Sequence, residues 1–111
     1  MLQIRTKGVN MADKRYSIIT DDLEHCIECG RYGINKHEIF YGTGKRQISI
    51  KYGLVIPLCQ AEHHNQYQSK GIHFDRELCD KWHKIGQKKA MEYYNWSKDD
   101  FRKIFGKNYL D

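Results

Sequence analysis

The part of the sequence that sets the fold reads Cys26-Ile-Glu-Cys29, then Val55-Ile-Pro-Leu-Cys59, then His63-His64. Two cysteines separated by two residues form a knuckle that holds a tetrahedral metal ion well. Cys59 ends an apolar stretch of strand length, and the histidine pair follows after three residues. Thiolates combined with one imidazole are typical ligands of Zn²⁺ in a closed tetrahedral site. The spacing therefore predicts a structural zinc held by Cys26, Cys29, Cys59 and either His63 or His64.

Other interpretations of the four cysteines stay open at this point. Cys59 is alternatively a small buried side chain, and Cys79 is a second candidate for the fourth zinc ligand. A redox pair at Cys26 and Cys29 would be expected to open a helix, whereas the sequence Gly30-Arg-Tyr-Gly33 favours a turn. Two disulfides would suit an exported, toxin-like protein. Because no apolar signal segment is visible, we expect a cytoplasmic protein with reduced thiols.

Length and charge limit the classes of protein that the chain can represent. With 111 residues and a mass of 13.3 kDa, it is too short for an enzyme with separate cofactor and substrate domains. The mean hydropathy is −0.81 and no apolar run approaches the length of a membrane span, so we expect no membrane association. The net charge of +5 favours nucleic acid as a partner. Residues 26–60 are the most one-sided segment, with five basic against two acidic side chains.

The expected organisation is an N-terminal arm over residues 1–14 and a single α+β domain over residues 15–111. Apolar patterns predict strands over residues 16–20, 34–41, 48–52 and 54–58. The glycines of residues 42–47 predict a loop, and residues 60–68 are predicted to form a short polar helix.

Two helices are predicted in the C-terminal part of the chain. Asp75 is suited to cap the N-terminus of a long helix that ends near Asn95. Its expected apolar face contains Leu78, Trp82, Ile85 and Tyr93, with Gly86 and Ala90 as small neighbours on the same side. Ser97 and Asp100 have the spacing of a capping box for the last helix, and Gly106 suits its C-terminal cap.

The six histidines suggest a second site with catalytic chemistry. His37 precedes Glu38 on a predicted strand, the adjacent pair His63 and His64 follows Cys59, and His73 comes nine residues later. Each histidine alone is most simply a surface or hydrogen-bonded residue. Taken together with the cysteine knuckle, three imidazoles predict a metal site that leaves coordination positions open for water or phosphate oxygen.

At this level of detail the sequence resembles the HNH endonucleases, and in particular small HNH-type proteins of phages and prophages of Gram-positive bacteria. The resemblance covers about residues 15–111. It is carried by the following stretches: Cys26-Ile-Glu-Cys29-Gly30, Lys36-His-Glu-Ile-Phe-Tyr-Gly42, Ser49-Ile-Lys-Tyr-Gly53, Pro57-Leu-Cys59, His63-His64-Asn65, Gly71-Ile-His73-Phe74 and Phe105-Gly-Lys-Asn-Tyr-Leu110. It implies a ββα-metal core (the His-Me finger) over about residues 34–74, a structural zinc knuckle, and additional helices over about residues 75–106.

The resemblance also implies a role for each candidate residue. His63 would complete the zinc site, and His37, His64 and His73 would hold a catalytic divalent metal such as Mg²⁺, Mn²⁺, Ni²⁺ or Zn²⁺. Glu38 stands where such enzymes usually carry the histidine that activates water, so the catalytic set is His37, Glu38 and His64. Three possibilities follow: Glu38 is the general base, His37 is the base and the metal has fewer protein ligands, or the protein has lost activity.

The implied reaction is hydrolysis of phosphodiester bonds in double-stranded DNA, with weak sequence preference, in the cytoplasm of a bacterial host cell. Lys45, Arg46 and Lys51 are the expected DNA contacts, because they carry the basic excess of the middle segment. The alternative is a catalytically inactive, zinc-stabilised module of the same fold that binds DNA or protein. That alternative does not require His37, Glu38 and His73 to converge.

Overall fold

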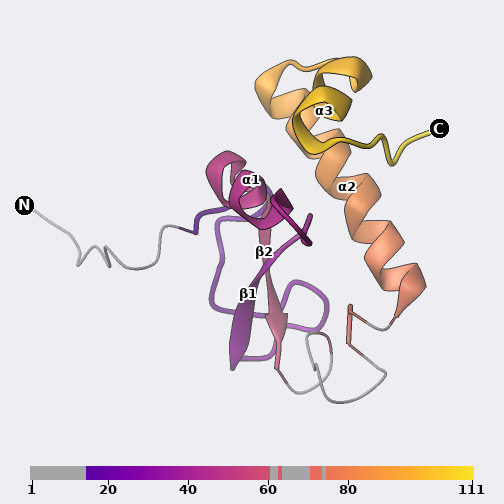
Figure 1. Ribbon diagram of the computed structural model, residues 1–111. Helices are drawn as coiled ribbons and strands as arrows, with labels where there is room; N and C mark the ends of the chain where they lie inside the picture. Colours follow the sequence, from indigo (N-terminus) through magenta and orange to yellow (C-terminus); the bar gives the residue numbers. More distant parts are fainter. Residues whose placement is uncertain (1–14, 61–62, 64–70, 74) are drawn as a thin grey trace, which may run out of the picture.

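A computed structural model describes residues 15–60, 63, 71–73 and 75–111, and these residues form a small α+β protein (Figure 1). The order of elements is β1 (Ile34–Glu38), α1 (Lys45–Tyr52), β2 (Val55–Cys59), α2 (Arg76–Tyr94) and α3 (Lys98–Phe105). β1 and β2 form an antiparallel sheet in which Ile34 pairs with Cys59 and Glu38 pairs with Val55. Within the described ranges, no helix combines the length and apolarity needed to cross a membrane.

The core lies where the strand pair meets the two C-terminal helices. β2 is buried at every position, as expected for a continuous apolar strand. The ring of Phe40, just after β1, lies 5.3 Å from the ring of Phe101 and 4.7 Å from that of Phe105, measured between centroids. Large buried side chains come from β2, α2 and α3 and from the segments beside these elements: Ile39, Phe40, Leu54, Ile56, Leu58, Ile72, Trp82, Phe101 and Phe105. Packing on α2 and α3 therefore fixes the position of the end of β1.

The segment between the strands differs from the prediction, because α1 occupies residues predicted to be a loop and a strand. The alternation of Ile48, Ile50 and Tyr52 suggested a strand, but Ile48 and Tyr52 are four residues apart and so also share one face of a helix. Both contact the core. Gly44 and Gly53 adopt the left-handed conformation at the two ends, with φ of 80° and 73°. Glycine reaches this conformation without steric cost, so the two glycines delimit the helix.

The strand predicted over residues 16–20 is also absent from the structure. The Ser17 hydroxyl accepts hydrogen bonds from the amides of Ile19 and Thr20, at 3.0 and 3.2 Å. Such a local side-chain turn competes with strand pairing for the same amides. The segment is instead anchored by the amide of Ile18, which donates to the carbonyl of Gly53 at 2.9 Å.

The predicted helix ends are confirmed, since they depend on local capping. The Asp75 side chain accepts from the amide of Leu78 at 3.1 Å, and α2 ends at Asn95. Ser97 and Asp100 form the reciprocal capping box of α3, and Gly106 follows its last turn.

One position on the expected apolar face of α2 was wrong, because Tyr93 is 66% exposed. The buried face runs through Trp82, Gly86 and Ala90, as predicted, and also includes Gln87. A Cβ atom at Gly86 would lie 3.1 Å from Cγ2 of Ile39, so the glycine lets α2 approach the end of β1 closely. The predicted arm over 1–14 and most of the helix predicted over 60–68 lie outside the described residues.

The two capping glycines of α1 provide a matched test of this packing. Gly53→Ala should destabilise the protein by at least about 1 kcal/mol more than Gly44→Ala, because overpacking adds to the cost of left-handed alanine. A Cβ at Gly53 would lie 2.5 Å from Cε2 of Tyr16, whereas one at Gly44 meets no atom within 4 Å. Urea unfolding of both variants measures the difference. Equal losses would show that Tyr16 does not pack against Gly53.

Candidate metal centre and active site

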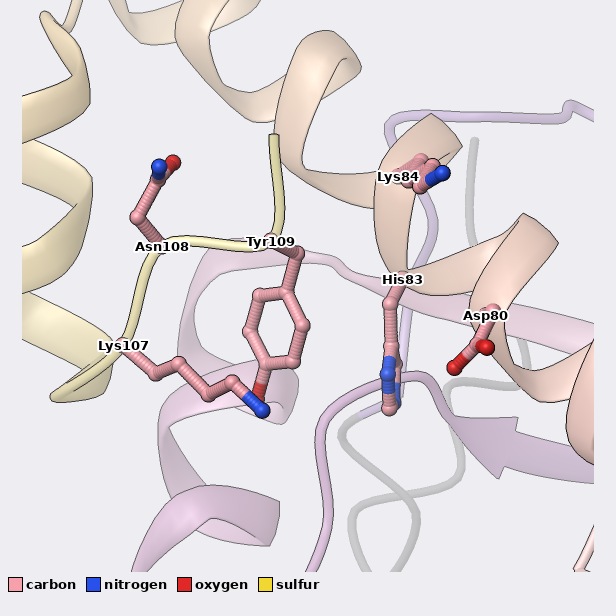
Figure 2. A pocket seen from close by; sticks show the side chains of 6 residues that line it. All are labelled: Asp80, His83, Lys84, Lys107, Asn108 and Tyr109. Carbon is pink, nitrogen blue, oxygen red and sulfur yellow. The ribbon is translucent and has the colours of Figure 1, made fainter. Parts of the chain in front are cut away.

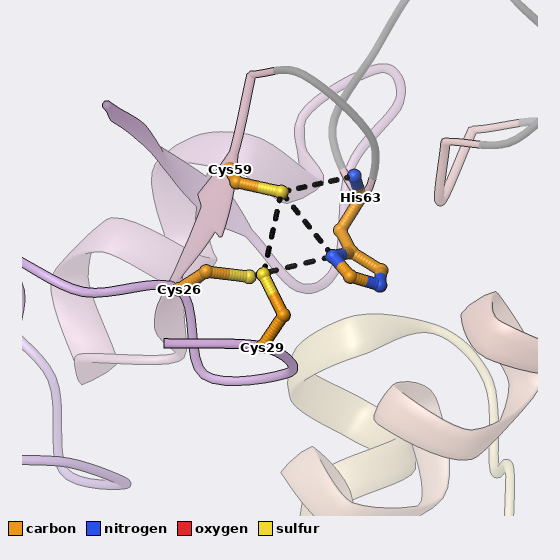
Figure 3. Close-up of side chains that lie close together, drawn as sticks. All are labelled: Cys26, Cys29, Cys59 and His63. Atoms are coloured by element: carbon orange, nitrogen blue, oxygen red, sulfur yellow. Dashed lines mark hydrogen bonds between the residues drawn. The ribbon is translucent and has the colours of Figure 1, made fainter. Parts of the chain in front are cut away.

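The cysteines predicted as zinc ligands converge at the end of the sheet where β1 begins and β2 ends. Cys26 and Cys29 lie in a tight turn closed by the amide of Gly30, which donates to the carbonyl of Cys26 at 2.8 Å. The amide of Ile27 donates to the carbonyl of Pro57 at 2.9 Å, so the turn is tied to β2 just before Cys59. His63 follows Cys59 and completes a cluster that we call the Cys/His cluster (Figure 3).

The geometry of the Cys/His cluster fits a tetrahedral zinc ion. Its four ligand atoms all lie within 4.8 Å of one another. Nδ1 of His63 is 3.5 Å from Sγ of Cys26 and 3.3 Å from Sγ of Cys59, and the sulfurs of Cys29 and Cys59 are 3.8 Å apart. Ordinary Zn–S and Zn–N bonds at tetrahedral angles place two sulfurs about 3.8 Å apart and a sulfur and a nitrogen about 3.5 Å apart. The donor set and its spacing therefore suit a metal such as zinc.

The composition of the cluster bears on the alternatives for the fourth ligand and for the disulfides. Its imidazole comes from His63, while His64 lies outside the described residues. Cys79 is on α2, where its sulfur contacts the Tyr41 hydroxyl at 3.4 Å and Nε2 of His83 at 3.7 Å, and it does not belong to the cluster. None of the four cysteines forms a disulfide in the described structure, so the disulfide interpretation has no support there.

Glu28, inside the Cys-x2-Cys turn, connects the Cys/His cluster to α2. Its Oε2 atom accepts hydrogen bonds from Nζ of Lys81 and from Nε1 of Trp82, both at 2.6 Å. Burial raises the pKa of Glu28, but the hydrogen bonds from Lys81 and Trp82 outweigh burial and leave the pKa below its ordinary value. The turn that binds the metal thus also positions the long helix.

Removing the Glu28 carboxylate should loosen this connection. We expect Glu28→Ala to lower the free energy of unfolding by about 2 kcal/mol, the scale of hydrogen bonds to a charged group. Glu24→Ala, in the same segment but exposed, should change it by less than about 0.5 kcal/mol. Urea unfolding with zinc present measures both values. A loss in Glu28→Ala no larger than in Glu24→Ala would contradict the proposed connection.

Three side chains gather around the other end of β1, and we call this group the histidine pocket: His37 on the strand, Tyr41 shortly after it, and His73. The rings of His37 and His73 meet edge to face, with centroids 5.2 Å apart, and Tyr41 lies 5.5 Å from His37 and 4.8 Å from His73. His37 is only 3% exposed and its Nε2 atom is buried. Two of the three imidazoles predicted for a catalytic metal therefore lie together. The third, His64, lies outside the described residues.

Glu38 has different neighbours from His37, as expected for adjacent residues of a strand, which point to opposite faces. Glu38 is 3% exposed. Its carboxylate accepts hydrogen bonds from the guanidinium of Arg15 and, at 2.9 Å, from Nη1 of Arg46. Arg46 reaches over from α1 and also lies 6.0 Å from the ring centroid of Tyr41. The paired carboxylate thus holds an arginine at the edge of the histidine pocket.

Burial and the nearby Arg46 favour the neutral form of His73. Burial lowers the pKa of His73, the nearby Arg46 lowers it further, and Glu38 opposes the shift without reversing it. A neutral imidazole retains the lone pair that a metal ligand or a proton acceptor needs. The pocket therefore offers an uncharged nitrogen beside a fixed positive charge.

The structure places the three predicted DNA contacts at the two opposite ends of α1. Lys45 and Arg46 begin α1 next to the histidine pocket, and the charge of Lys45 acts on His83 nearby. Lys51 lies at the other end of α1, where its ammonium is 5.3 Å from the ring centroid of Tyr52. Arg15, Tyr41 and His83 were not singled out from the sequence. Of these, only His83 carried a local signal, since it follows Cys79 by one helical turn.

We compared the chain with protein-family models, with curated proteins and with solved structures, and none of the three comparisons found a match.

Proposed function

We propose that this protein is a metal-dependent endonuclease of the HNH type, which hydrolyses or nicks phosphodiester bonds of DNA. The observation that carries the proposal is the meeting of His37 and His73, 5.2 Å apart between ring centroids, beside the Glu38–Arg46 pair. A zinc-stabilised module that only binds would not need these side chains to converge. The order β1, α1, β2 and the zinc-type cluster are compatible with a ββα-metal core.

In this proposal His37 takes the proton from the attacking water. His37 and Glu38 are the two candidates for the general base, and the residues around them favour His37. Both carboxylate oxygens of Glu38 already accept from arginines, whereas His37 faces the second histidine. Glu38 then acts as a positioning residue that holds Arg46, whose side chain is 56% exposed and can meet a phosphate with its remaining N–H groups. A base in this position typically contributes two to four orders of magnitude in rate (about 10²- to 10⁴-fold).

His73 and His64 are the residues that we assign to a divalent metal, with Mg²⁺, Mn²⁺, Ni²⁺ and Zn²⁺ as candidates. His73 fits this role because its surroundings keep the imidazole neutral. When bound, such an ion polarises the scissile phosphate and stabilises the leaving oxygen. The expected place of action is the bacterial cytoplasm, where thiols of a zinc site stay reduced.

Nicking of supercoiled plasmid DNA, measured with each of the four metals, tests the proposal. We expect the wild type to cut with at least one metal, and His73→Ala to cut at least about 100-fold more slowly. His25→Ala is the matched control, because His25 lies elsewhere, bonded to Asp22 at 2.7 Å, and should cut normally. DNA binding without cleavage under every condition would support the inactive binding module instead.

A further inference from the structure

Two adjoining hollows lie between α2 and the segment that follows α3. One has a volume of about 340 Å³ and is lined in part by His73, Arg76 and Cys79. The other has a volume of about 240 Å³ and is lined in part by Lys84 and Tyr109. The two share three lining residues: Asp80, His83 and Lys107. They therefore form one continuous groove, and His73 connects that groove to the histidine pocket.

The walls of this groove are held in place by specific contacts. The buried side chain of Gln87 on α2 donates to Oδ1 of Asn108 and accepts from the amide of Tyr109, both at 2.7 Å. The ring of His83 stacks on that of Phe40 with centroids 5.3 Å apart, and the ring of Tyr109 lies 4.6 Å from it (Figure 2). The C-terminal segment is thereby fixed opposite α2, and a ligand would meet a preformed surface.

The groove carries more positive than negative charge at its rim. Arg76, Lys84 and Lys107 are exposed, against Asp75 and Asp80. The Asp75 side chain already caps α2. Burial lowers the pKa of His83, and although Asp80 opposes the shift, Lys107 and Lys45 lower the pKa further. The positive charges of α1, α2 and the C-terminal segment therefore all lie near the groove.

We propose that this groove binds the phosphate backbone of duplex DNA next to the cleaved bond, with Arg76, Lys84 and Lys107 as the phosphate contacts. The inference rests on the proposed function and adds to it the path of the DNA strand. Arg76 and Lys84 are eight residues apart on α2, which corresponds to about 12 Å along the helix axis. That length matches the rise of three to four nucleotides of one strand, about 3.4 Å each.

Duplex binding measured over a range of NaCl concentrations, with Ca²⁺ replacing the catalytic metal to limit cleavage, tests the proposal. Arg76→Ala combined with Lys107→Ala should weaken binding about 10- to 60-fold near 0.1 M salt and should reduce the salt slope by about 1.8, since each lost phosphate contact removes about 0.9. The matched control is Lys88→Ala with Lys89→Ala, which removes two exposed α2 charges that line neither hollow. It should bind within about twofold of wild type.

The outcomes separate this inference from the proposed function. If the wild type nicks DNA but the double variant and its control bind DNA equally well, the proposal that DNA binds in the groove is wrong and the proposed nuclease activity stands. A wild type that neither binds nor nicks DNA would overturn both. Exchange of the two cations, Arg76→Lys with Lys107→Arg, should keep most of the affinity, and a loss as large as that of the alanine pair would mean that packing, not charge, is responsible.

Discussion

Cys26→Ser should leave the protein without a cooperatively folded core. Cys26 is 3% exposed and its sulfur belongs to the Cys/His cluster, so serine in its place removes a thiolate that the interior cannot replace. Structural zinc contributes about 10–16 kcal/mol in small zinc-folded peptides, which equals or exceeds the whole stability of a typical domain, about 5–15 kcal/mol. We therefore expect loss of most bound zinc and of the cooperative thermal transition.

The chain supplies its own control for this experiment. Cys79→Ser removes a thiol that lies on α2 outside the Cys/His cluster, and it should retain one zinc per chain and unfold cooperatively. Chelation of wild-type zinc should unfold the protein, and added Zn²⁺ should restore it, because metal binding and folding are coupled in domains of this kind. Well-folded wild-type protein purified with almost no zinc would show that the four side chains serve only as core.

The features that could be predicted from the sequence depend either on residues close together in the chain or on rare combinations of residue types. The ends of α2 and α3 depend on residues within one turn, Asp75 with Leu78 and Ser97 with Asp100, and such signals can be read from spacing alone. The Cys/His cluster joins distant segments, but its residue types and spacing are rare outside metal sites. The α1 segment was predicted wrongly because Ile48 and Tyr52, two of its three alternating apolar residues, share one face of a helix as readily as one face of a strand.

The environment of Glu38 could not be predicted in the same way. Its partners Arg15 and Arg46 are 23 and 8 residues away, and no periodic pattern links them to it. The groove could not be predicted from the sequence for the same reason, because it depends on a contact between Gln87 and the C-terminal segment 21 residues further along the chain. Long-range pairs of common polar residues carry no signature in one sequence, whereas cysteines and histidines do.

A second large effect is expected when the residue proposed as general base is replaced. We expect His37→Gln to reduce the nicking rate by about 10²- to 10⁴-fold, the usual contribution of a general base, and Glu38→Gln to reduce it by less than about 10-fold. The reason is geometric: His37 faces His73, while both oxygens of Glu38 are engaged by Arg15 and Arg46. Glu38→Gln keeps the shape of the side chain, but it removes the charge and replaces one of the two acceptor oxygens by an amide NH2 group, so one of the two arginines loses its acceptor.

Rates alone do not separate a base from a residue that holds Arg46, so the two variants are compared by pH profile and zinc content as well. Glu38→Gln should keep the pH dependence of the wild type, because the group that takes the proton is unchanged, while weaker phosphate contact by Arg46 should appear as a higher KM. His37→Gln should lose activity at every pH although its zinc content matches that of wild type. An equally inactive Glu38→Gln, with normal zinc and normal DNA affinity, would instead assign the proton transfer to the carboxylate and leave His37 as a metal ligand.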